Sequence, residues 1–228
     1  MCFSPEASFA GGVIISTIGI ATIKKVHKSS QLVFASIPLF FGIQQIAEGF
    51  LWLSLPYSEY ETIQKISAYT FLVMAQVLWP LIIPISLLLM EENKTRKKGL
   101  KILMTAGLSL SIYYIYCLLV FDVNPQIMDY HIKYKTNFPR SLRIPAFIVY
   151  LTVTITPLFL STVKKTHLLG SLMFLSCIVS VLFFTQYLTS VWCFFAAIIS
   201  GVIYWILRDT KKDFIKNSAQ TDPFINRR

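Results

Sequence analysis

Apolar residues fill seven long runs of this chain, and short segments rich in charged and turn-forming residues separate them. Each run has roughly the 20 residues that a helix needs to cross a bilayer. The pattern therefore predicts an all-α fold, a polytopic transmembrane bundle of seven helices that forms one domain over residues 1–207, followed by a basic tail at 208–228. The predicted spans are residues 7–23, 32–55, 66–90, 101–121, 144–163, 168–187 and 190–207.

The composition agrees with this pattern. Of the 228 residues, 55% are hydrophobic and 14% are charged, and the mean hydropathy is +0.62. Soluble domains have roughly 45–50% apolar and about 25% charged residues. The composition thus excludes a disordered chain, a disulfide-rich secreted scaffold and an ordinary soluble enzyme. We interpret the first run as a helix rather than a signal peptide, because no basic residue precedes it and no small-residue cleavage site stands out.

The distribution of basic residues predicts the orientation of the helices. Of the 21 lysine and arginine residues, 16 lie in the first, third and fifth connections and the C-terminal tail, and 5 lie in the other connections. Basic residues near span ends are retained in the cytoplasm. We therefore predict an outside N-terminus and a cytoplasmic tail. Topology and anionic lipid explain the basic tail, so we expect membrane lipid rather than nucleic acid as its partner.

The connection from Asp122 to Arg143, 22 residues long, is the longest and lies on the predicted outer side. It mixes aromatic residues with turn formers, so we expect it to fold over the outer mouth of the bundle. No internal repeat is apparent, which disfavours an inverted-repeat carrier. Within the third span, Pro80 and Pro84 should bend the helix near the middle of the membrane.

Glu48 is the only carboxylate inside a predicted span, in the half nearer the outside. An acid at this depth indicates a functional site, because an ionised carboxylate in a bilayer is costly. Helical spacing places Gln45 and Trp52 on the same face, and Gln44 lies one turn below Glu48. The alternative is a neutral acid that hydrogen-bonds a neighbour and serves only helix association.

Other polar and aromatic residues lie at a similar predicted depth on the remaining helices. If the seven helices close into a ring, these side chains line one outward-facing cavity with Glu48 at its centre. The candidate ligand-binding residues are Gln44, Gln45, Glu48, Trp52, Gln76, Trp79, Tyr113, Tyr116 and Trp192. Cys117, Gln186, Tyr187 and Cys193 lie at the same predicted depth.

The cysteines and histidines show no metal-binding spacing, so we expect no metal site. The seventh span contains no lysine that could form a Schiff base with retinal. Cys2 follows the initiator methionine, and after removal of Met1 it could act as a nucleophile with its own α-amino group as base. The alternative is an ordinary packed or disulfide-bonded thiol.

Several short motifs in the first 90 residues resemble a family of uncharacterised bacterial seven-helix integral membrane proteins that open with Met-Cys-Phe-Ser. The motifs are Met1-Cys2-Phe3-Ser4, Ala7-Ser8-Phe9, Gln44-Gln45, Glu48-Gly49, Trp52-Leu53 and Trp79-Pro80 with Pro84. The resemblance implies a bacterial cytoplasmic (inner) membrane protein and carries no activity. It also implies that Cys2 and Ser4 belong with the Glu48 face, so we expect the N-terminal tail to fold into the outer opening.

Three functions follow from these observations. The leading hypothesis is a sensor, binder or minor transporter that holds a small molecule or lipid in the outward-facing cavity. The first alternative is an intramembrane enzyme that acts on a lipid-linked substrate, with Glu48 as acid or base and Cys2 or water as nucleophile; without a His/Asp metal set, we lean against an enzyme. The second alternative is a structural or assembly partner. The sequence leaves both the cofactor and the oligomeric state open.

Overall fold

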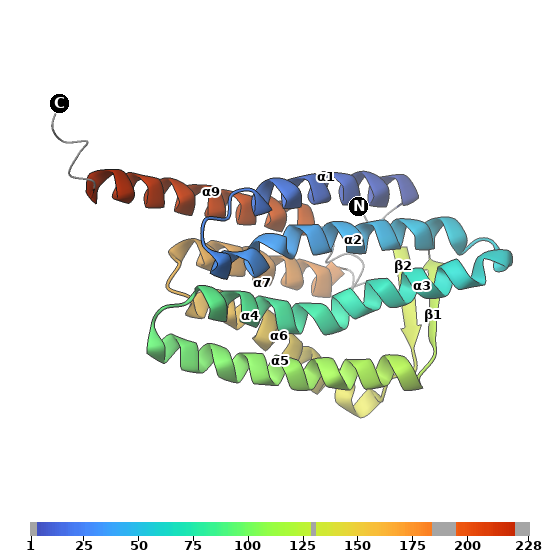
Figure 1. The fold of residues 1–228 in the computed structure, drawn as a ribbon. Helices are drawn as coiled ribbons and strands as arrows, with labels where there is room; N and C mark the ends of the chain where they lie inside the picture. The colour runs from blue at the N-terminus through green and yellow to red at the C-terminus, as the bar shows by residue number, and fades with distance from the viewer. Residues whose placement is uncertain (1–3, 129–130, 184–194, 222–228) are drawn as a thin grey trace.

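The computed structural model describes residues 4–128, 131–183 and 195–221, which form seven helical rods and one β-hairpin (Figure 1). The third rod consists of two α-helices joined by a π-helical segment. The rods are α1 (Pro5–Ile23), α2 (Leu32–Ser54), α3 (Glu61–Leu72) with η3 (Val73–Leu78) and α4 (Trp79–Met90), α5 (Lys94–Val120), α6 (Arg140–Leu160), α7 (Lys164–Phe183) and α9 (Ala196–Thr221). Short 3₁₀ turns, η1 (Ser29–Gln31) and η2 (Ser58–Tyr60), precede α2 and α3.

Within the described residues, five of these rods are long and apolar enough to cross a membrane, and the protein is therefore a helical membrane protein. Most predicted spans match a helix closely. The third rod begins at Glu61 rather than at residue 66, and α9 continues to Thr221, beyond the predicted end of the last span at residue 207. The facing ends of the last two predicted spans fall in residues 184–194, outside the described residues.

Local sequence signals set the beginnings of two helices. The Ser4 hydroxyl accepts a hydrogen bond from the Ala7 N–H at 3.2 Å, and Pro5 occupies the first helical position of α1. Asn93 performs the same role for α5, because its Oδ1 accepts from the N–H groups of Thr95 and Arg96. Each cap satisfies backbone donors that have no partner within the helix.

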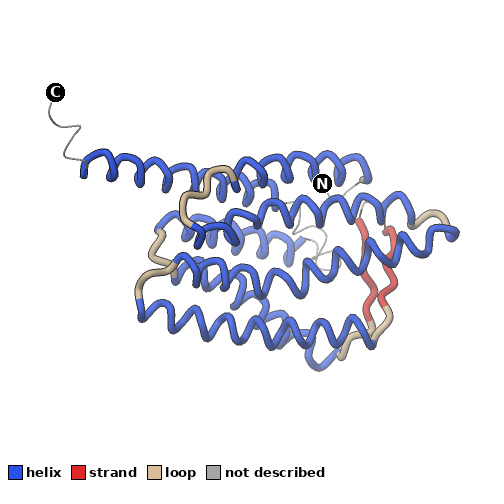
Figure 2. The backbone as a smooth tube through the Cα atoms, viewed as in Figure 1, coloured by secondary structure: helices blue, strands red, loops and turns tan. Residues whose placement is uncertain are grey.

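The long connection after α5 forms a β-hairpin that the sequence analysis did not predict. Its strands, β1 (Val123–Met128) and β2 (His131–Thr136), pair antiparallel. Ile132 is buried against Leu51 and Trp52 of α2. The Tyr134 ring stacks on Phe71 of α3 at 4.9 Å. The hairpin thus crosses one end of the bundle, near the α2–α3 turn (Figure 2); we call this the hairpin end.

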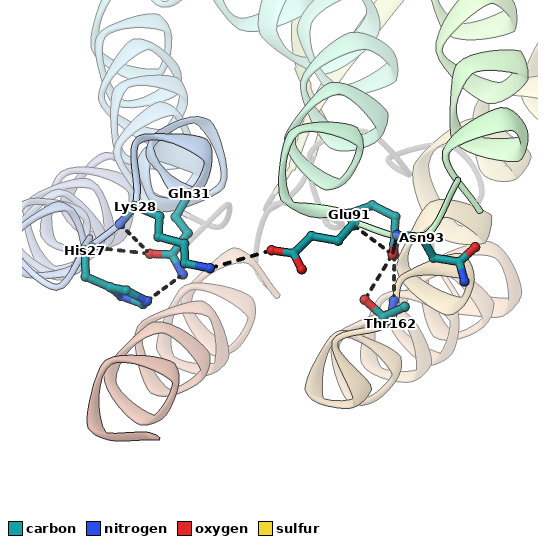
Figure 3. Close-up of polar contacts among 7 residues, drawn as sticks. His27, Lys28, Gln31, Glu91, Asn93 and Thr162 are labelled. Carbon is teal, nitrogen blue, oxygen red and sulfur yellow. Dashed lines mark hydrogen bonds and ion pairs between the residues drawn. The ribbon is translucent and has the colours of Figure 1, made fainter. Parts of the chain in front are cut away.

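Three helix–helix turns lie at the opposite end of the bundle (Figure 1), which we call the basic end, and Figure 3 shows the polar contacts between them. The α1–α2 turn contacts the α4–α5 turn through an ion pair of 3.6 Å between Lys28 and Glu92. The α4–α5 turn contacts the α6–α7 turn through hydrogen bonds between Glu91 and Thr162. Nearby, Lys165 of α7 pairs with Asp209 of α9 at 2.8 Å. The connections in which the sequence concentrates lysine and arginine are therefore neighbours in space.

The largest apolar core lies inside the bundle between α2, α4, α6, α7 and α9. Its fully buried side chains include Phe34, Leu87, Leu158, Leu169 and Ile203. Against this core, α1 runs antiparallel to α2, so that the ring of Phe9 near the start of α1 packs on Gly49 near the end of α2 (Figure 1). The core surrounds the cavity described next.

Candidate functional site

A cavity of about 120 Å³ lies in the middle of the bundle and receives side chains from six of the seven rods. Aromatic and aliphatic groups make up most of its wall, as is typical of small-molecule sites. The aromatic residues are Phe41, Trp79, Tyr114, Phe147 and Tyr150. The polar residues besides the tyrosines are Gln44, Gln76 and Thr154. The remaining lining residues are Ile37, Ala75, Ile83, Leu169, Met173, Ile199 and Ile203.

The π-helical segment η3 forms one wall of the cavity, and Pro80 explains its geometry. Proline has no N–H, so the carbonyl of Ala75, five residues earlier, lacks the donor that a continuing π-helix would supply. The Tyr150 hydroxyl of α6 donates to this carbonyl at 2.7 Å. Ser111 of α5 donates to the Val77 carbonyl at 2.8 Å. Side chains of neighbouring helices thus stabilise the irregular backbone, as membrane interiors require.

Two glutamines, Gln44 of α2 and Gln76 of η3, line the cavity. The Trp79 indole N–H donates to Gln44 Oε1 at 3.0 Å, and the Phe41 ring stacks on Trp79 with centroids 4.1 Å apart. Gln76, in η3, presents a buried Oε1 that has no hydrogen-bond partner among the described residues. A buried acceptor without a donor is unfavourable by about 1–3 kcal/mol. This oxygen is enclosed by protein atoms, although the residue Gln76 lines the cavity.

The predicted cluster on α2 divides into two groups. Gln44 lines the cavity, whereas Gln45, Glu48 and Trp52 are buried elsewhere and do not line it. Trp52 packs beneath the hairpin, against Ile132. Neither the Gln45 amide nor the Trp52 indole N–H has a hydrogen-bond partner among the described residues. Gln45 and Glu48 are each 0% exposed, so both side chains lie inside the bundle.

On α5, the tyrosine that lines the cavity is Tyr114, not the predicted Tyr113 or Tyr116. Tyr116 is 56% exposed on the outer surface of the bundle and does not line the cavity. Tyr113 is half-buried and packs beside Tyr114, the residue that does line it. The sequence reasoning also missed Tyr150 and Thr154 of α6. Both are polar residues inside a predicted span and lie one helical turn apart, which is the signal that could have found them.

The predicted residues Cys2, Gln186, Tyr187, Trp192 and Cys193 lie outside the described residues. Cys117 and Cys177 are buried free thiols. No group of three or more His, Cys, Asp or Glu side chains that could hold a metal ion occurs in the described part of the chain.

The fold and the cavity together define a helical membrane protein with an internal, aromatic-lined site. The chain belongs to a family of unknown function, DUF6629, whose model matches residues 1–218. This assignment agrees with the resemblance to an uncharacterised family. No curated protein and no solved structure matches the chain.

Proposed function

We propose that the protein binds a small, largely apolar molecule in the cavity beside η3. The observation that carries this proposal is the internal space of about 120 Å³ itself, walled by aromatic side chains and with amides and hydroxyls among its lining residues. Binding pockets typically combine an apolar lining with a few polar groups that fix the orientation of the ligand. The π-helical segment gives further support, because such segments occur frequently at functional sites.

The orientation predicted from the basic residues belongs to the same proposal. With the basic end in the cytoplasm, the hairpin end faces outside, and a ligand enters from the outer side or from the outer leaflet. The proposal still has an outward-facing cavity, but its lining includes Gln76 and Trp79 rather than Glu48. The protein acts in this proposal as a binder or sensor in the cytoplasmic membrane of a bacterium.

The enzymatic alternative has less support from the geometry. It needs Glu48 to reach a bound substrate, and the carboxylate does not line the cavity. The lining residues within the described part of the chain offer apolar groups, amides and hydroxyls, which are poor acids and bases near neutral pH. Reversible binding is the function that these side chains serve best.

A matched pair of threonines on α6 tests the proposal. Thr154 is 1% exposed and lines the cavity, whereas Thr152 is exposed on the outside of the same helix. Both hydroxyls donate to the carbonyl four residues earlier. Thr154→Leu therefore adds volume inside the cavity, and Thr152→Leu makes the same chemical change where the helix faces lipid.

The measurement is native mass spectrometry of the protein gently purified from membranes. We expect a reproducible small-molecule adduct on the wild type and on Thr152→Leu, and its loss from Thr154→Leu. Thermal unfolding of all three proteins controls for the fold. An adduct that persists in a folded Thr154→Leu protein, or a wild type that carries none, would contradict the proposal.

A further inference from the structure

We infer that the exposed face at the beginning of α5 binds the headgroup of an anionic phospholipid through Lys94, Lys98 and Lys101. This site lies at the basic end of the bundle and is separate from the cavity, so it does not depend on the function proposed for the cavity. Three properties of α5 carry the inference: the arrangement of its lysines, their lack of acidic partners, and the apolar surface that continues from them.

The three lysines lie on one exposed face of α5. Lys94, Lys98 and Lys101 are each exposed, and their spacing of four and three residues places them on the same side of the helix. At 1.5 Å per residue, the three positions span about 10 Å along the helix axis. The helix itself forms one side of the bundle (Figure 1). Three positive charges therefore lie close together on a surface that other molecules can reach.

These lysines have no acidic partner within the described residues, because none of the ion pairs found there involves them. Other basic side chains at the same end are already engaged. Lys28 pairs with Glu92, and Lys165 pairs with Asp209. Arg96 donates to backbone carbonyls. Like charges three or four residues apart on a helix repel one another, so an anion bound between the α5 lysines would remove an unfavourable interaction.

Beyond the lysines, the same face of α5 becomes apolar. Leu108, Ile112 and Leu119 continue the helical spacing and are all exposed. From Lys101 to Leu119 the helix rises about 27 Å, close to the roughly 30 Å of the hydrocarbon core of a bilayer. When the apolar stretch spans the hydrocarbon, the lysines lie at the depth of the lipid phosphates. A phospholipid therefore matches both parts of the face, with its acyl chains beside the apolar residues and its headgroup beside the lysines.

The charge of this face favours a lipid over a second copy of the chain. Two copies that packed through α5 in a symmetric dimer, with the same orientation in the membrane, would bring identical lysines together. A free anion would contact the lysines and leave the apolar surface uncovered. An anionic phospholipid complements both, because clusters of basic residues beside a membrane attract anionic headgroups.

Two triple variants with equal changes in charge test the site. In the first, glutamine replaces Lys94, Lys98 and Lys101, which removes the positive charges and keeps long polar side chains. The second removes three lysines that also lie at the basic end but on other elements, in the α1–α2 turn and at the start of α7. Its substitutions are Lys24→Gln, Lys25→Gln and Lys164→Gln. A further variant with arginine at the three α5 positions keeps the charge.

Native mass spectrometry of the full chain in a neutral detergent measures the binding of added lipid. The probes are dioleoylphosphatidylglycerol and dioleoylphosphatidylcholine, which have the same acyl chains and differ in net charge. Working in detergent removes orientation from the comparison, which matters because lysines near span ends help to set the topology.

We expect the wild type to bind phosphatidylglycerol more tightly than phosphatidylcholine, and the α5 glutamine variant to lose more than about tenfold of this preference. Each positive charge near an anionic surface strengthens the attraction by about fivefold. The second triple variant and the arginine variant should retain the preference. Thermal unfolding in the same detergent controls for the fold, and the double variant Lys98→Gln/Lys101→Gln replaces the triple variant if that does not fold.

Three outcomes would overturn the inference. A wild type without a preference for phosphatidylglycerol would show that the face does not recognise an anionic headgroup. An equal loss in the two glutamine triple variants would leave only a general attraction of anionic lipid to the basic end. A dimer that forms in place of the lipid adduct, and that the α5 substitutions alter, would assign this face to a second copy of the chain.

Discussion

At the scale of single residues, Glu91 is the most heavily hydrogen-bonded carboxylate in the described part of the chain. It lies at the end of α4 and is 1% exposed. Its Oε2 accepts from the Thr162 N–H at 2.7 Å, and its Oε1 accepts from the Thr162 hydroxyl and from the N–H groups of Glu92 and Asn93 (Figure 3). Arg96 complements it by donating to the Leu160 and Ser161 carbonyls. Together these two side chains join the α4–α5 and α6–α7 turns.

We expect Glu91→Gln to lower the free energy of unfolding by about 1–3 kcal/mol, because an amide NH₂ would face backbone N–H donors in place of an oxygen. Glu92→Gln is the matched control, since its side chain is 87% exposed and makes only a 3.6 Å ion pair with Lys28. Equilibrium unfolding in detergent, followed by circular dichroism, measures both. Equal stability of the two variants would show that the Glu91 contacts contribute nothing.

The effect of Glu91 should also depend on pH. Burial acts to raise the pKa of this carboxyl, but the hydrogen bonds from Asn93, Thr162 and Glu92 outweigh burial and hold the pKa below its ordinary value of 4.5. A depressed pKa in the folded state means that the stabilisation is complete above pH 4.5 and is lost as the pH falls through the folded-state pKa. The stability difference between wild type and Glu91→Gln should therefore narrow below this pH.

At the scale of elements, the irregular third rod depends on a close approach of α5. A Cβ added at Gly107 would collide with the carbonyl oxygen of Pro80, the second residue of α4. Glycine at this position lets the two backbones meet, as small residues do between membrane helices. The contact also keeps Ser111, one turn further along α5, within reach of the Val77 carbonyl.

We expect Gly107→Ala to destabilise the protein by about 1–3 kcal/mol, since the backbone of Pro80 cannot move away as a flexible side chain could. Gly201 in α9 provides the control, because a Cβ added there has no atom of another described helix within 4 Å. Gly201→Ala should be neutral or stabilising by up to about 1 kcal/mol, the gain in helix propensity. Thermal unfolding of the wild type and both variants in the same detergent measures these changes in stability. A tolerated Gly107→Ala would mean that the helices can separate at this point.

The sequence predicts the helices well because each one only has to be apolar and long enough to span a bilayer. It does not predict η3, since Pro80 and Pro84 indicate a bend without specifying its backbone hydrogen bonds. The sequence of β2 does contain a pattern that indicates the hairpin. Ile132 and Tyr134 alternate with Lys133 and Lys135 along β2, which is the period of a strand with one face packed.

The candidate site was only partly predictable for a related reason. Helical spacing indicates which residues share a face, but not which neighbour that face contacts. Gln44 and Gln45 are adjacent in sequence and point about 100° apart, so only Gln44 meets Trp79. Likewise Tyr114 and Tyr116 are two residues apart and lie on nearly opposite sides of α5, one in the cavity wall and one on the outer surface. Helix rotation and order are set by packing between distant segments.

At the scale of the whole molecule, the basic residues are distributed unequally between the two ends of the helix bundle. The helices alternate in direction, so every second connection lies at the same end of the bundle (Figure 1). Of the 16 basic residues in the first, third and fifth connections and the tail, 14 lie in the described residues, at the basic end, and the hairpin end has the other 5 of the 21. The ion pairs at this end, Lys28 with Glu92 between two turns and Lys165 with Asp209 between α7 and α9, leave most of this positive charge uncompensated.

This asymmetry leads to a prediction about orientation that two single cysteines can test. Ser58 and Thr95 are exposed residues of similar size at the hairpin end and the basic end. In a background without the four native cysteines, Ser58→Cys should react with a membrane-impermeant maleimide in intact cells. Thr95→Cys should react only after permeabilisation, because positively charged connections are retained in the cytoplasm.

The opposite labelling pattern would place the hairpin end in the cytoplasm. Labelling of both sites in intact cells would indicate that the chain inserts in two orientations. Either result would also change the proposal for the cavity, because the side from which a ligand enters follows from the side on which the hairpin lies. Orientation therefore decides whether a molecule bound beside η3 comes from the environment or from the cell.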